Sequence, residues 1–378
     1  MPTPQKIDVE FDRRVMAAAL RLGLTTQGRA HPNPAVGCII VRDAGEDRVV
    51  VGSGATAPGG RPHAERIALA EAGEAARGAT AYVTLEPCAH ESKAGPCAGA
   101  LAAAGVARVV TAMADPDPRT SGAGHAMLED AGIAVTTGIL EEAARRAHSG
   151  HIARVTRGRP HVTLKLAVSA DGMIGRRDSE RLMISGPPAF AAVQVMRTTF
   201  DAVMVGIGTV LADDPQLTVR LPGLEKRTPA RIILDAHART PPSARIFRTQ
   251  SDAPLKIFVG PDAPSANISG LAAAGAEVIA VPALAAGKLD LVDVLARLAD
   301  AGFTRLFAEG GAEVGAALLA ADLVDEVVIV RAPLVVAEGG VPALAGTPLS
   351  AVEASPRFRL LDTVPLGDDV MRFYWRTA

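Results

Sequence analysis

The sequence is poor in cysteine and aromatic residues, and it has no excess of positive charge. Three cysteines in 378 residues are too few for a disulfide framework, which favours a protein of the reducing cytoplasm. Phe11 and Tyr82 are the only aromatic residues before residue 148, too few for a platform on which single-stranded nucleic acid could stack. Lysine and arginine number 15 against 17 acidic residues through Ala147, and 24 against 24 after it. Neither half is a polycation, so a nucleic-acid partner is disfavoured.

Long apolar segments are missing as well. No run of about eighteen uninterrupted apolar residues occurs, and a membrane-spanning helix needs such a run. The first residues lack a basic stretch followed by an apolar one, so we expect no secretory signal. The 48% of hydrophobic residues can still form large cores, and the length suffices for two ordinary domains. We therefore expect a cytoplasmic protein that acts on a small molecule, without nucleic-acid or membrane partners.

The sequence does contain residues typical of a metal site between positions 63 and 97. His63 and Glu65 are separated by one residue, a strand-like apolar segment follows, and then come Pro87-Cys88 and Cys97. This order is the signature of zinc-dependent nucleobase deaminases, in which an imidazole and two thiolates hold the metal. A glutamate that is not a ligand moves the protons in that class. We predict that His63, Cys88 and Cys97 bind one zinc ion at helix N-termini, and that Glu65 is the catalytic acid and base.

A purely structural zinc site is the main alternative. Such sites usually have four protein ligands, and only three good candidates are present. Cys38 could be a fourth, but residues 35–41 have the pattern of a buried strand, which favours a core role for this cysteine. Asn33 lies between two prolines next to that strand. The sequence leaves open whether Asn33 binds a polar edge of a ligand or only forms a turn.

Strand and helix patterns alternate along the chain and predict two α/β domains, residues 1–147 and 148–378. In the first, a helix over 11–27 precedes strands and short helices, which predicts a mixed or parallel sheet with helices on both faces. In the second, a strong strand over 161–169 opens a further series of strands, and residues 358–375 have the pattern of a closing hairpin.

Two glycine-containing turns follow predicted strands in the second domain. Residues 206–210 offer backbone N–H groups and the hydroxyl of Thr209 to a phosphate, and residues 309–311 repeat the arrangement before another helix. The full dinucleotide fingerprint is absent, because Leu211 stands where its third glycine would be. The spacing alone therefore leaves a phosphate site and a pair of tight connections equally open.

Taken together, these motifs resemble the bifunctional family of riboflavin biosynthesis that couples a pyrimidine deaminase to a pyrimidine reductase. The resemblance rests on residues 32–38, 63–65, 84–90, the eight-residue gap before Cys97, and residues 165–172, 206–220 and 309–311. It implies a cytidine-deaminase-like three-layer domain, followed by a dihydrofolate-reductase-like α/β domain. It also implies one zinc ion, NADPH and two consecutive reactions on a phosphorylated pyrimidine: hydrolytic removal of a ring amine, then reduction of the ribosyl side chain to ribityl.

The resemblance further implies roles for individual residues. NADPH would be bound by Val168, Met183, Thr209, Asp213, Gly311, Ala312, Glu313, Val314, Gly315, Ala316 and Ala317. The substrates would be bound by Asn33, His90, Lys165, Arg181, Arg197, Leu217, Arg220 and Glu309. Arginine is the expected grip on the ribose phosphate, because its planar fork matches two phosphate oxygens. For Lys165, the alternative is a surface lysine at the end of a strand.

The chain departs from the family pattern in two places. Residues 181–185 read Arg-Leu-Met-Ile-Ser, where the family often has Ser, any residue, then Trp-Ile-Thr. Met183 can still pack on a nicotinamide, whereas Arg181 replaces a hydroxyl. Between the cysteines, Ser92, Ala94 and Gly95 replace the more usual Gly, Thr and Pro, while His90 and Lys93 keep an imidazole and a cation.

Two other functions remain open at this stage. One is a deaminase whose second domain binds a nucleotide without reducing anything, motivated by the altered segment 181–183. The other is a zinc-stabilised metabolite sensor without catalysis. For any of the three functions we expect a homo-oligomer, either a dimer or a tetramer.

Overall fold

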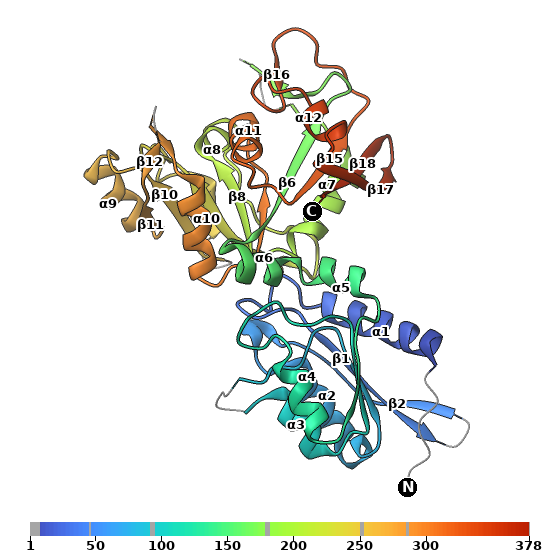
Figure 1. Cartoon of the computed structure of the whole chain (residues 1–378). Coiled ribbons are helices and arrows are strands. Elements are labelled where there is room, and N and C mark those ends of the chain that lie inside the picture. The colour runs from blue at the N-terminus through green and yellow to red at the C-terminus, as the bar shows by residue number, and fades with distance from the viewer. Residues whose placement is uncertain are drawn as a thin grey trace. The chain divides into compact units, whose positions relative to one another are not determined.

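The computed structural model describes residues 8–44, 47–90, 95–177, 182–249, 253–284 and 287–377. The chain forms two compact units, Met1–Gly158 and Arg159–Ala378 (Figure 1). The division comes later than the expected one after residue 147, because helix α6 (Ser149–Arg157) is held on the first unit by contacts of His148 and His151. No helix in the described ranges has both the length and the apolar character that crossing a membrane requires.

The first unit is built on a five-stranded mixed sheet of order β2-β1-β3-β4-β5. Strand β1 is antiparallel to β2 and β3, while β3, β4 and β5 run parallel. Its elements are α1 (Val9–Leu24), β1 (Gly37–Ala44), β2 (Asp47–Ala55), η1 (Pro58–Gly60), α2 (Ala64–Ala72), η2 (Gly73–Ala76), β3 (Thr80–Val83), α3 (Cys97–Ala104), β4 (Arg108–Thr111), α4 (Ala123–Asp130), β5 (Ala134–Thr136), α5 (Glu141–Ala147) and α6. The predicted mixed sheet is confirmed.

Helices α1 and α2 cover opposite faces of this sheet. Cys38 pairs with Gly54 across β1 and β2, so these two residues share a face and Gly37 points to the other one. A Cβ atom added to Gly54 would lie 2.3 Å from the carbonyl oxygen of Ala64 in α2, and one added to Gly37 would lie 1.9 Å from that of Ala19 in α1. Only glycine allows both approaches. The three-layer arrangement expected for this half is confirmed.

The second unit is built on a nine-stranded sheet of order β11-β10-β9-β8-β14-β6-β15-β18-β17. Its sheet strands are β6 (His161–Val168), β8 (Ala202–Gly206), β9 (Ala230–Leu234), β10 (Leu255–Val259), β11 (Glu277–Ala280), β14 (Arg305–Ala308), β15 (Glu326–Arg331), β17 (Phe358–Leu366) and β18 (Asp369–Arg376). The strands from β11 to β15 are parallel, and β18 and β17 form the predicted antiparallel hairpin at one edge. The α/β class is confirmed for this half too.

Helices and small strand pairs complete the second unit. The helices are α7 (Pro187–Arg197), α8 (Ile207–Asp213), α9 (Ser265–Ala273), α10 (Leu291–Asp300), α11 (Ala312–Ala320) and α12 (Ser350–Glu353), with η3 (Glu225–Arg227) and η4 (Arg245–Thr249). Strands β7 (Met173–Arg176) and β16 (Gly340–Pro342) pair with each other, as do β12 (Ala283–Leu284) and β13 (Lys288–Leu289). Because the central strands are parallel, the turns after β8 and β14 lie at the same edge, where α/β proteins bind ligands.

His148 anchors α6 to the first unit from a fully buried position. Its Nε2 atom lies 3.1 Å from both the carbonyl oxygen and the hydroxyl of Thr84. The next histidine, His151, places its Nε2 atom 2.7 Å from Asp115 Oδ1. Burial, and then the charge of His151, lower the pKa of His148 from 6.5 to about 4, while Thr84 and Asp115 oppose the shift. The imidazole of His148 is therefore neutral in the folded protein.

We predict that mild acid destabilises the first unit through His148. The unfolded chain protonates this imidazole near pH 6.5 and the folded chain only near pH 4, so stability is fully present above pH 6.5 and declines between these values. The loss reaches about 3 kcal/mol. Urea unfolding of the metal-free full chain between pH 7 and pH 4 measures it. His148→Gln should flatten this dependence, whereas His237→Gln, which changes an exposed histidine, should not. An equal slope in wild type and His148→Gln would contradict the prediction.

Candidate active sites

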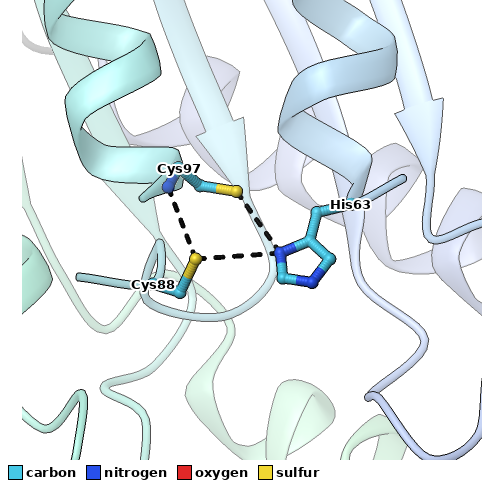
Figure 2. A group of neighbouring side chains, drawn as sticks. All are labelled: His63, Cys88 and Cys97. Atoms are coloured by element: carbon cyan, nitrogen blue, oxygen red, sulfur yellow. Dashed lines mark hydrogen bonds between the residues drawn. The ribbon is translucent and has the colours of Figure 1, made fainter. Parts of the chain in front are cut away.

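His63, Cys88 and Cys97 come together from three segments of the first unit (Figure 2). His63 is the N-cap residue of α2, Cys97 is the first residue of α3, and Cys88 follows β3. The Nδ1 atom of His63 lies 3.3 Å from the Cys97 sulfur and 3.7 Å from the Cys88 sulfur, and all three ligand atoms lie within 4.8 Å of one another. Ideal tetrahedral zinc would separate nitrogen from sulfur by about 3.6 Å. The donor set and its spacing therefore fit one zinc ion.

The electrostatics of the site favour a thiolate at Cys88. Hydrogen bonds from the Cys97 side chain, from His63 and from the backbone N–H of Cys97 lower the pKa of Cys88 to about 4, against the effect of burial. The backbone donor belongs to the N-terminus of α3, whose dipole also stabilises negative charge. His63 at the N-terminus of α2 and Cys97 at that of α3 agree with the expectation that the two segments meet at helix N-termini.

Glu65 lies in the first turn of α2, two residues after His63, and only 4% of it is exposed. Burial raises the pKa of Glu65, and the positive charge of His63 opposes the shift. A carboxyl group with a raised pKa can both donate and accept protons near neutral pH. Within the described residues, the ligand group has three members and Glu65 is not one of them, so the arrangement suits catalysis better than a closed structural site.

The surroundings of Cys38 indicate whether it is a metal ligand or a core residue, and those of Asn33 whether it belongs to the site or only forms a turn. Cys38 is fully buried in the core of the first unit, as predicted, and does not belong to the ligand group. The Nδ2 atom of Asn33 donates to the carbonyl oxygen of Gly60 at 2.8 Å and lies 3.3 Å from Nε2 of His63. This contact places Asn33 beside the metal-binding imidazole, which favours a role at the site over a plain turn.

The remaining candidates near the metal ligands are less completely described. His90 is partly buried, and its Nδ1 atom has no hydrogen-bond partner among the described residues. Gly95 has a positive φ of 70°, which glycine tolerates, and its carbonyl oxygen accepts a hydrogen bond from Arg66. Residues Ser92, Lys93 and Ala94, where the chain departs from the family pattern, lie outside the described residues, as does Arg181.

In the second unit, the two glycine turns lie against each other at the carboxyl ends of β8 and β14. The backbone N–H of Gly311 donates to Thr209 Oγ1 at 3.2 Å. A Cβ atom added to Gly206 or Gly310 would lie 2.8 Å or 2.7 Å from the side chain of Val314. The glycines are thus required for tight packing. The same packing leaves the N-terminus of α11, which Gly311 caps, at the ligand-binding edge of a parallel sheet.

A charged cluster adjoins these turns. Arg197 binds Glu309 with both arms of its fork, Nε to Oε1 at 2.6 Å and Nη2 to Oε2 at 3.1 Å, and its Nη1 atom donates to the carbonyl oxygen of Thr218. Burial lowers the pKa of Lys165, and the charge of Glu309 opposes that shift. Burial raises the pKa of Glu309, but Arg197, Lys165 and Arg220 outweigh it and keep the net pKa below its ordinary value.

This geometry refines the expectation for Arg197. Its guanidinium is engaged by Glu309 and Thr218, and only 8% of the residue is exposed. Arg197 is therefore better placed to hold Glu309 in position than to grip a phosphate. Sequence reasoning missed the pairing because the two residues are 112 positions apart. Arg220 is exposed, and its guanidinium lies 5.1 Å from the ring centre of Phe190.

The other predicted residues of the second unit occupy varied positions. Val168 is fully buried at the end of β6, Asp213 ends α8, and Leu217 is buried with a positive φ of 57°. Met183 is 54% exposed. The predicted phosphate segment is the N-cap and first turns of α11: Gly311, Ala312, Glu313, Val314, Gly315, Ala316 and Ala317.

We predict that each folded chain binds one zinc ion and that Cys88→Ser lowers its zinc content. Serine is a poor zinc ligand compared with the thiolate that Cys88 supplies, and two remaining ligands do not make a stable site. Metal analysis of the purified variant measures the loss. Cys38→Ala is the matched control, because Cys38 is buried in the same unit but lies outside the ligand group. Equal zinc in Cys88→Ser and wild type would contradict the assignment.

Comparison with known proteins agrees with both sites. Residues 9–113 match the cytidine and deoxycytidylate deaminase zinc-binding region, and residues 160–371 match the RibD C-terminal domain. The riboflavin biosynthesis protein RibD of Aquifex aeolicus is 35% identical over 97% of this chain and 99% of its own length. That of Escherichia coli is 37% identical over 95% of this chain and 98% of its own length.

Solved structures match along the whole chain as well. Acinetobacter baumannii RibD has a TM-score of 0.85 at 34% identity, covering 98% of this chain and all of its own. A diaminohydroxyphosphoribosylaminopyrimidine deaminase/5-amino-6-(5-phosphoribosylamino)uracil reductase from Thermotoga maritima has a TM-score of 0.82 at 30% identity, covering 98% and 99%. The family resemblance drawn from the motifs is therefore confirmed, and the chain belongs to the RibD family of riboflavin biosynthesis proteins.

Proposed function

We propose that the chain is a bifunctional enzyme of riboflavin biosynthesis. Its first unit would remove the ring amine of 2,5-diamino-6-(5-phosphoribosylamino)pyrimidin-4(3H)-one by zinc-dependent hydrolysis, and its second unit would reduce the ribosyl side chain to ribityl with NADPH. The observation that carries the proposal is the convergence of His63, Cys88 and Cys97 beside a buried glutamate. The second unit adds the sheet edge after β8 and β14, where α/β proteins bind ligands. The two activities named for the Thermotoga maritima protein support it.

In the proposed deamination, the residues of the first unit hold the metal and move protons. Zinc bound there would lower the pKa of a water molecule so that it can attack an amidine carbon at neutral pH. Glu65 would take one proton from this water and pass it to the ring nitrogen; it would then take the remaining proton of the added hydroxyl and pass it to the amine, which leaves as ammonia. The Nδ2 atom of Asn33 donates a hydrogen bond to the carbonyl oxygen of Gly60. Its Oδ1 atom would then accept a hydrogen bond from the edge of the pyrimidine.

In the proposed reduction, the second unit orients cofactor and substrate. NADPH would supply a hydride to C1' of the opened ribosyl unit. Thr209, Asp213 and the start of α11 would hold the cofactor, with Val168 and Met183 against its nicotinamide. Substrate contacts would come from Lys165, Leu217, Arg220 and Glu309, and Arg197 would act by keeping Glu309 in place. Arg181 completes the substrate contacts proposed for the second unit, and His90 belongs to those proposed for the first.

The proposal also includes the partners, the cellular compartment and the oligomeric state of the enzyme. Its partners are small phosphorylated pyrimidines, and it functions in the cytoplasm as a homo-oligomer, either a dimer or a tetramer. Support for the compartment comes from the cysteines: two of the three converge on the metal site and the third is buried in the core. A reducing environment keeps such thiols free.

The decisive experiment for deamination is Glu65→Gln. Glutamine keeps the shape of Glu65 but cannot carry a proton, so ammonia release should fall by about 10² to 10⁴ while zinc is retained. Ammonia release from the diaminopyrimidine phosphate measures the effect, and NADPH consumption with the deaminated intermediate is the internal control. Wild type that releases no ammonia would reject the deaminase, and unchanged release in Glu65→Gln would reject the role of Glu65. A metabolite sensor would show no release in either protein.

For the reduction, we predict that Glu309→Gln slows turnover without weakening cofactor binding. The negative charge of Glu309 pairs with Arg197 and balances the charge of Lys165, and glutamine lacks this charge. The substrate should then be positioned less well, which should lower kcat/KM by about ten-fold to a hundred-fold. NADPH oxidation measures turnover, and fluorescence titration measures NADPH affinity. Wild type that binds NADPH but does not oxidise it would favour the non-reducing alternative, and an unchanged kcat/KM in the variant would contradict the role of Glu309.

A further inference from the structure

Glu86 is a buried carboxylate close to the metal ligands that no step of the proposed mechanism uses. It lies between β3 and Cys88, and its side chain is 0% exposed. Four backbone N–H groups donate to it: those of Asp115 (3.1 Å) and Gly122 (3.0 Å) to Oε2, and those of Gly124 (2.9 Å) and His125 (3.3 Å) to Oε1. A carboxylate tolerates such burial only when its oxygens are satisfied in this way.

The four donors belong to the approach to α4 and to its first turn. Gly122 is the N-cap residue of α4, and Gly124 and His125 lie in the turn that follows. The N–H groups of a first helical turn have no partners inside the helix, and the helix dipole favours an anion there. Glu86 thus caps α4 from a segment 29 to 39 residues earlier in the chain. The backbone N–H of Glu86 also donates to the carbonyl oxygen of Met113.

A close backbone contact locks the same segment from a second direction. A Cβ atom added to Gly124 would lie 2.0 Å from the carbonyl oxygen of Pro87 and 3.2 Å from the side chain of Glu86. The first turn of α4 therefore touches the residue that directly precedes the Cys88 ligand. On its other side, Cys88 accepts hydrogen bonds from the N-terminus of α3: the Cys97 N–H donates to its sulfur at 3.4 Å, and the Ala98 N–H to its carbonyl oxygen at 3.2 Å.

From this arrangement we infer that Glu86 is a positioning residue of the zinc site. By clamping the Pro87–Cys88 backbone against α4, it fixes the Cys88 sulfur at the distance from His63 and Cys97 that a single metal ion requires. Glu86 is not a member of the candidate ligand group, and its effect on catalysis would pass through Cys88. This inference deepens the proposed deamination and rests on it for the kinetic readout alone, because metal binding can be measured without substrate.

The test compares Glu86→Gln with wild type in the full chain loaded with Co²⁺ or Zn²⁺. Glutamine has nearly the same size, but its amide nitrogen would face N–H donors in place of one carboxylate oxygen. We expect altered cobalt ligand-field and thiolate charge-transfer bands, and zinc release to a chelator faster by about ten-fold to a hundred-fold. We also expect a similar loss of deamination kcat, with KM and NADPH-dependent reduction unchanged. These readouts would not respond to a cap that only stabilises α4.

Glu71→Gln is the matched control. Glu71 also accepts a backbone N–H, that of Ser53 at 2.7 Å, but it is exposed and lies on α2 away from its N-terminal ligand. The inference would be overturned if Glu86→Gln had the same spectra, zinc release and kcat as wild type and differed only in a lower melting temperature. If Glu86→Gln does not fold, Glu86→Asp, which keeps the charge but shortens the reach, gives the same readouts and decides in the same way. Wild type without ammonia release would reject the proposed deamination, while the spectra and zinc release would still test the positioning role.

Discussion

The metal-binding geometry depends on how closely α2 approaches the sheet of the first unit. His63 and Glu65 reach the site only because the start of α2 is pressed against β2 at Gly54, where a methyl group would collide with the backbone of Ala64. A larger residue there would displace the whole first turn, and the imidazole with it. Misplacing a ligand by about 1 Å is enough to weaken a metal site. Metal binding in the first unit therefore depends on the close packing of Gly54 against α2, although Gly54 has no polar side chain.

The two units stabilise charge at strand ends in different ways. In the first, the thiolate of Cys88 is balanced by hydrogen bonds and by the N-terminus of α3, an arrangement that suits a cation held by fixed ligands. In the second, Glu309 is balanced by Arg197, which is itself fixed by the carbonyl oxygen of Thr218, and by the charge of Lys165.

Sequence reasoning succeeded where chemistry is encoded locally and failed where it depends on distant contacts. The spacing of His63, Cys88 and Cys97 predicted a cluster that the structure brings together, and short apolar runs predicted most strands of both sheets. The pairing of β7 with β16 was not predicted, because short strands have little pattern of their own. The structural units divide after Gly158 and not after residue 147, because α6 is held on the first unit by side chains that contact residues far away in sequence.

Buried polar residues illustrate the same limit within the site. Nothing in the neighbourhood of Glu86 in the sequence indicates that its four donors come from residues 115–125, and Arg197 has no local feature that marks Glu309 as its partner. The motif that contains Glu86 is recognisable, but the reason for a carboxylate there becomes visible only when α4 is in place. A buried charge next to a ligand is informative for this reason: its partners must be supplied by the fold.

Opposite demands on protonation explain why the ligands and the acid lie so close together in the first unit. The metal ligands must lose their protons, whereas the proton carrier must be able to keep one. The pKa of Cys88 is lowered by donors from Cys97 and His63, while burial raises the pKa of Glu65. The first backbone N–H of α3 donates to the Cys88 sulfur, whereas Glu65 is buried in the first turn of α2, where loss of hydration is the largest influence on its carboxyl group. Hydrogen bonds that include one from the N-terminus of α3 therefore lower the pKa of Cys88, and burial raises that of Glu65.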